Sequence, residues 1–150
     1  MINQVNEVEV SYKRKLRELP HIGEPSDCFQ YITPFYHPIV DYQESFKVML
    51  LSRKNQILGM SDISFGTDTS TTVFIKKICQ LAILTNASGV VVFHNHPSGN
   101  SKPSREDLKV TEKIKKALDI FSITLLDHLI IYTNTQGEMT FNSAANNDWL

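Results

Sequence analysis

Two histidines separated by one residue are the part of this sequence best suited to chemistry. His94 and His96 follow the apolar run at 90–93, where a short strand is expected to end. Alternate residues of a strand point to the same side, so the two imidazoles can meet one metal ion. Asp107 is well placed as a third ligand, because the intervening loop can return its carboxylate to the pair. Such a set leaves a fourth tetrahedral position for water, as catalytic zinc sites do.

Each of these residues also has a plain structural interpretation. A His-x-His sequence alone is more often an ordinary piece of loop than a zinc site. Ser104 followed three residues later by Asp107 is typical of a helix start, with Ser104 as the N-cap. Pro97 and Gly99 alone indicate only a shaped loop. The conjunction of a strand end, two histidines, a rigid loop and a capped helix within residues 94–107 favours the metal site.

A third histidine lies inside an apolar segment. Asp127 and His128 interrupt the run at 123–132, so one of them should face inward and need a hydrogen-bond partner. We expect a structural hydrogen bond for His128 in preference to a contact with the metal site.

Apolar periodicity indicates the elements that position these residues. The predicted strands span residues 45–51, 57–65, 90–93, 123–132 and 138–141. The predicted helices span 27–36 and 72–85, with a third that begins near 104. Alternation over 4–12 predicts a further strand or an extended arm. This order predicts an α/β (α+β) fold with a mixed sheet flanked by helices.

Length and composition indicate a soluble domain that is not built to coat nucleic acid. The chain has 150 residues, 41% of them hydrophobic, and a formal net charge of −1. No apolar run approaches the ~20 residues of a membrane span, and the N-terminus has no signal-peptide core. Cys28 and Cys79 lie far apart, and the apolar helical pattern around Cys79 predicts a buried thiol rather than a disulfide. We therefore expect a cytoplasmic protein without membrane partners.

The sequence resembles a known family at the metal-site segment. The spacing of His94, His96, Ser104 and Asp107 matches the JAMM metalloprotease motif, and the string HNHPSG…PS..D is similar to its bacterial RadC-like JAB (MPN) branch. Further similar segments in family order are 44–55, 65–67, 84–89 and 125–131, so the resemblance covers about residues 40–135. It implies a cytidine-deaminase-like JAB/MPN fold.

The resemblance also implies roles for individual residues. It places one zinc ion per chain on His94, His96 and Asp107. It places the motif serine at Ser104, whose hydroxyl would donate a hydrogen bond to the oxyanion of a tetrahedral intermediate. This role is compatible with helix capping.

The family further requires an upstream glutamate that hydrogen-bonds the catalytic water. We assign this proton shuttle to Glu44, at the start of the strand expected over 45–51. Asp62, which also precedes an apolar segment, is the second choice. Glu106 is less suitable, because it neighbours Asp107 and should point elsewhere around the helix.

These expectations combine into two hypotheses of function. The first is a zinc metallopeptidase of JAMM type that hydrolyses a peptide, isopeptide or small amide. The second is a non-catalytic interaction or DNA-associated module, because residues 102–116 carry a local charge of +3. We divide the chain into an N-terminal arm and linker (1–25) and a JAB/MPN domain (26–150). Longer RadC proteins carry a helix-hairpin-helix region that residues 1–40 do not resemble, so DNA repair is taken from the family name only.

Overall fold

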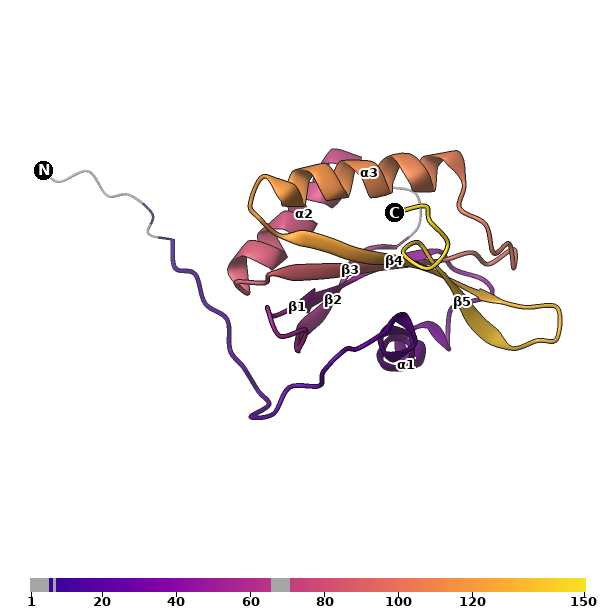
Figure 1. The fold of residues 1–150 in the computed structure, drawn as a ribbon, viewed down its shortest axis with the longest axis horizontal. Helices are drawn as coiled ribbons and strands as arrows, with labels where there is room; N and C mark the ends of the chain where they lie inside the picture. The colour runs from indigo at the N-terminus through magenta and orange to yellow at the C-terminus, as the bar shows by residue number, and fades with distance from the viewer. Residues whose placement is uncertain (1–5, 7, 66–70) are drawn as a thin grey trace, which may run out of the picture.

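A five-stranded sheet, in the order β2-β1-β3-β4-β5, organises the fold. The computed structural model describes residue 6, residues 8–65 and residues 71–150. The strands are β1 (Ser45–Leu51), β2 (Ile57–Phe65), β3 (Gly89–Asn95), β4 (Thr124–Thr133) and β5 (Met139–Ser143). The helices are α1 (Pro25–Tyr36), α2 (Thr71–Leu84) and α3 (Arg105–Asp119). Figure 1 shows α1 on one face of the sheet and α2 and α3 on the other.

The sheet is mixed, as the sequence predicts. Strand β1 pairs antiparallel with both β2 and β3, and β5 pairs antiparallel with β4. The central pair, β3 and β4, is parallel, and α3 provides the crossover between them. The carboxyl end of β3 therefore lies close to the start of α3, which is where the sequence places its candidate ligands.

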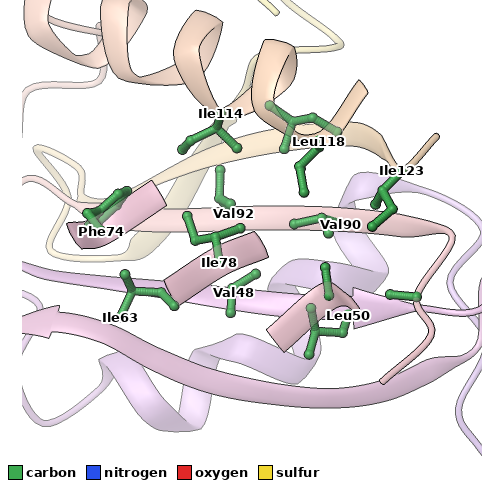
Figure 2. Packing of buried hydrophobic residues seen from close by; sticks show 13 residues of the cluster. Val48, Leu50, Ile63, Phe74, Ile78, Val90, Val92, Ile114, Leu118 and Ile123 are labelled. Carbon is green, nitrogen blue, oxygen red and sulfur yellow. The ribbon is translucent and has the colours of Figure 1, made fainter. Parts of the chain in front are cut away.

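Alternation along the central strands divides the core into two layers. Val48, Val90 and Val92 face α2 and α3, where they pack with Ile78 and Ile114 (Figure 2). The intervening residues of the same strands face α1 and form a second cluster, to which Met49, Val91, Phe93, Ile32 and Tyr36 belong. Because β1 and β3 are buried on both faces, each contains a continuous apolar run, 48–51 in β1 and 90–93 in β3.

For residues 4–12 the structure has the second of the two predicted alternatives, an extended arm, and the prediction for Cys79 needs correction. Within the range 4–12, residues 4, 5 and 7 lie outside the described part of the chain, and the others form no strand. Val8 and Val10 are exposed, so their alternation reflects no buried face, and Figure 1 shows this arm leading away from the sheet. Both cysteines are free, but the buried thiol is Cys28, whereas Cys79 is only half-buried. In the described residues we find no helix with the length and apolarity that crossing a membrane requires.

Candidate metal centre

The histidine pair lies where β3 ends, on the face covered by α2 and α3. His94 follows Val90 and Val92 on that face and is only 3% exposed. Its Nε2 atom lies 2.8 Å from Nε2 of His96. The ring of Phe46, opposite His94 in the β1–β3 ladder, stacks on the His94 ring with a 7° interplanar angle. The two imidazoles therefore converge, as the i, i+2 spacing predicts.

Asp107 closes this cluster from the first turn of α3. One carboxylate oxygen, Oδ1, lies 3.1 Å from Nε2 of His94, and Oδ2 lies 3.1 Å from Nε2 of His96. Oδ2 also accepts a hydrogen bond from the Ser104 backbone N–H at 2.7 Å, and the Ser104 hydroxyl accepts one from the Asp107 N–H. This is a capping box. The capping and ligand interpretations of Asp107 therefore hold together.

Asp107 and His96 influence each other's pKa. Burial alone would raise the pKa of Asp107, but hydrogen bonds with His94 and His96 hold that pKa well below its usual value. The hydrogen bond with Asp107 raises the pKa of His96 against the opposing effect of burial. The carboxylate is thus ionised, and it attracts positive charge to the position between the two rings.

The three side chains fit a bound cation such as zinc. His96 Nδ1 lies 2.7 Å from the carbonyl oxygen of Asn100, and because a carbonyl only accepts, Nδ1 carries the hydrogen. Nε2 is therefore the atom through which His96 can bind a cation, in place of the hydrogen that it shares with Asp107. One donor atom from each of the three residues lies within 4.8 Å of the others. Two imidazoles and one carboxylate are the ligand types of hydrolytic zinc sites.

The loop between the ligands is fastened to β4 and β5. His96 donates its backbone N–H to the carbonyl of Ile131, and the Asn142 side chain donates to the carbonyl of Ser101 at 2.6 Å. Gly99 has φ +80°, and a Cβ there would lie 3.1 Å from the Thr133 carbonyl oxygen. Glycine is therefore required for this loop to pass close to β4.

Glu44 lies beside the cluster, one residue before β1. The antiparallel ladder pairs Phe46 with His94, and Glu44 precedes Phe46 by two residues, at the same end of the ladder as the histidine pair. Glu44 is exposed, and its charge contributes to the raised pKa of His96. The assignment of Glu44 as proton shuttle stays a prediction, with this position as its support.

The other acidic candidates lie elsewhere. Asp62 pairs with Lys47 across the β1–β2 ladder and forms an ion pair with it. Lys47 alternates with Phe46, so this pair lies on the α1 side of the sheet, opposite to His94. Glu106 is exposed and pairs with Lys109 along α3.

The hydroxyl of Ser104 can still donate a hydrogen bond while it caps α3. Its oxygen accepts the Asp107 N–H, and this bond does not use the hydroxyl hydrogen. Ser104 is exposed, so the hydroxyl can donate to a group that approaches from solvent. Its role toward an oxyanion stays a prediction.

His128 contacts the cluster directly, contrary to the expectation of a purely structural bond. The ring is fully buried, and its Nε2 atom lies 2.7 Å from Nδ1 of His94. Its Nδ1 atom lies 2.7 Å from Oγ1 of Thr111 in α3. Burial holds the pKa of His128 well below its ordinary value, so the ring is neutral. Sequence reasoning missed Thr111, because no local pattern relates it to β4.

Asn95 is the other residue that sequence reasoning missed. It lies between the two histidines, so it points to the opposite face and is 0% exposed. Its amide donates to the carbonyls of Val40 and Gln43, and its Oδ1 atom accepts the backbone N–H of Ser45. Asn95 thereby fastens the segment that precedes β1, which carries Glu44, to the strand that carries the histidines.

The fold is a mixed sheet with helices on both faces, and its His-x-His pair contacts the first turn of the crossover helix. These features together define a domain of the JAB class. The family model described as the RadC-like JAB domain matches residues 22–146, and this chain belongs to that family. The fold and the family predicted from sequence are confirmed, and the match extends beyond the predicted range of 40–135 at both ends. The division of the chain after residue 25 stays a prediction.

The similar curated proteins carry the name UPF0758 protein. One from Coprothermobacter proteolyticus is 37% identical over 119 residues, which cover 78% of this chain and 51% of the relative. One from Thermotoga maritima is 37% identical over 120 residues, covering 79% of this chain and 54% of the relative. One from Gloeothece citriformis is 45% identical over 89 residues, covering 59% and 37%. The chain thus spans about half the length of the first two relatives.

Proposed function

We propose that this protein is a zinc-dependent hydrolase of amide bonds. The observation that carries the proposal is the convergence of His94, His96 and Asp107 at the end of a central strand, with donor atoms within 4.8 Å of one another. Zinc bound there would supply Lewis acidity, which polarises a substrate carbonyl and makes a water molecule more acidic. The family match is consistent with this chemistry.

Three residues around the cluster have further roles in the proposed reaction. Glu44, which lies just before β1 and contributes to the electrostatics of His96, accepts the proton of the attacking water and passes it to the leaving nitrogen. The Ser104 hydroxyl donates to the carbonyl oxygen as negative charge develops there. Asn95 holds the segment before β1 in place, so that Glu44 keeps its position relative to the histidines. The substrate is a peptide, an isopeptide or a small amide.

Glu44→Gln tests this function. The amide keeps the size of the side chain but cannot accept the proton, so hydrolysis should fall by about 100-fold or more while one zinc per chain is retained. The measurements are kcat/KM on a panel of peptide, isopeptide and small amide substrates, and metal content by elemental analysis. Glu106→Gln is the matched control, because Glu106 is exposed and pairs with Lys109 outside the cluster. Equal activity of Glu44→Gln and wild type would contradict the proposed role.

A second candidate function is contact with DNA through α3. Between residues 102 and 116 every basic side chain is exposed, namely Lys102, Arg105, Lys109, Lys113, Lys115 and Lys116. If this face binds DNA, affinity should fall steeply with salt and survive His94→Ala, but be lost when Lys113 and Lys115 are changed to Glu. A fluorescence anisotropy titration at several salt concentrations distinguishes this candidate from the hydrolase.

A further inference from the structure

A chain of three hydrogen bonds runs behind the metal cluster. His94 Nδ1, on the side of the ring away from Asp107, lies 2.7 Å from Nε2 of His128. His128 Nδ1 lies 2.7 Å from Oγ1 of Thr111. The Thr111 hydroxyl in turn lies 2.6 Å from the backbone carbonyl oxygen of Asp107, one helical turn earlier. The chain thus joins β3, β4 and α3, and it ends at the residue that supplies the carboxylate.

The Asp107 carbonyl at the end of this chain determines which atom donates in each of its hydrogen bonds. The Asp107 carbonyl can only accept, so the Thr111 hydrogen points to it and the Thr111 oxygen is left to accept from His128. His128 therefore carries its hydrogen on Nδ1. The ring is 0% exposed, where a positive charge would be costly, so Nε2 of His128 has a lone pair and accepts from Nδ1 of His94. With its hydrogen held on Nδ1, His94 can bind the metal through Nε2, the atom that faces His96 and Asp107.

We infer that Thr111 and His128 are positioning residues, which set the tautomer of His94 so that its Nε2 atom is free to bind the metal. The inference rests on the metal site of the proposed function and deepens it. The two histidine ligands are prepared in different ways. His96 is set by a carbonyl of its own loop, Asn100, whereas His94 depends on a strand and a helix that are distant in sequence. Partners of this kind orient a ligand and raise its basicity.

Removal of the Thr111 hydroxyl should reverse the direction of the hydrogen bond between His94 and His128. In Thr111→Val the buried Nδ1–H of His128 loses its acceptor, which is unfavourable. Transfer of the hydrogen to Nε2 of His128 lets it donate to His94 Nδ1 instead. The hydrogen of His94 then moves to Nε2, where it competes with the metal. We expect zinc affinity to fall about 10- to 100-fold, the range seen when such partners are removed.

The test combines a direct view of the tautomers with a measurement of affinity. Long-range ¹H–¹⁵N NMR of ¹⁵N-histidine-labelled, metal-free protein should show His94 and His128 both protonated at Nδ1. In Thr111→Val the His94 hydrogen should appear at Nε2, and competition with a chelating dye should show weaker zinc binding. Thr111→Ser keeps the hydroxyl and should restore both results. Thr33→Val is the matched control, since Thr33 donates to the Phe29 carbonyl at 2.6 Å in α1, on the other face of the sheet.

Two results would overturn the inference. One is a wild-type His94 that carries no hydrogen at Nδ1, a finding that needs no variant to fold. The other is a folded Thr111→Val that matches Thr33→Val in both tautomer and zinc affinity, which would leave Thr111 and His128 with a packing role only. The proposed hydrolase fails separately, because absence of turnover, or of zinc uptake by wild type, leaves the NMR result for the metal-free rings intact.

Discussion

Asp107→Asn should abolish one-to-one zinc binding while α3 stays folded. The asparagine oxygen can still accept the Ser104 backbone N–H, so the cap of the helix is kept. The neutral amide is a poor zinc ligand and removes the negative charge that faces both histidines. We expect zinc affinity to fall by at least about 100-fold, more than for a residue that only orients a ligand.

The measurement is a chelator-competition titration together with thermal unfolding. Zinc at 100 times its wild-type Kd should stabilise the wild type by about 2.7 kcal/mol, and Asp107→Asn by no more than about 0.4 kcal/mol at the same concentration. Asp119→Asn, the same change at the other end of α3, is the control and should behave as wild type. Circular dichroism checks that the helix persists. Tight zinc binding by Asp107→Asn would place the metal elsewhere.

Asn95→Ala should be the most destabilising single change at the site, lowering the free energy of unfolding by about 2–4 kcal/mol. The substitution removes three hydrogen bonds at a fully buried position and leaves the carbonyls of Val40 and Gln43 and the N–H of Ser45 without their partner. Urea unfolding of the metal-free protein measures the loss.

Asn147→Ala is the matched control for this substitution. The Asn147 amide also makes two hydrogen bonds, to Asn142 and Ser143, but the residue is exposed and water can replace them. Its effect should stay below about 0.5 kcal/mol. If the two variants are equally stable, Asn95 does not fasten the segment before β1 in the way described.

The candidate metal cluster could be predicted from sequence because its residues are local. His94, His96 and Asp107 lie in one segment, and strand periodicity together with a helix-start pattern is enough to bring them together. Their partners are not local. Phe46 and His128 reach His94 through strand pairing, and Thr111 reaches His128 across the interface of α3 with β4. Hydrophobic periodicity indicates which face a residue occupies, but not which residue of another element it meets.

The same limit explains why the strand alternative for 4–12 and the buried thiol predicted for Cys79 are not found. Alternation over 4–12 has the period of a strand, but a strand also needs a partner, and Val8 and Val10 face solvent. Cys79 has the spacing of a buried helical position, yet only the packing of α2 on the sheet decides how deeply it lies. Burial is a property of the assembled layers, and the sequence indicates it most directly where a short run is apolar throughout, as at 90–93 in β3.

At the end of β3, His94, Asn95 and His96 point alternately to the two faces of the sheet, and this has a consequence for folding. Val90 to Phe93 are all apolar, so this run alone would pair almost equally well after a shift of one residue, which exchanges the two faces. Such a shift would turn His94 and His96 toward α1 and bury the Asn95 amide against α3, away from all its acceptors. The side chains of the candidate metal cluster and of Asn95 therefore also specify the alignment of the central strand. A misaligned strand is less stable than the correct one even without a metal.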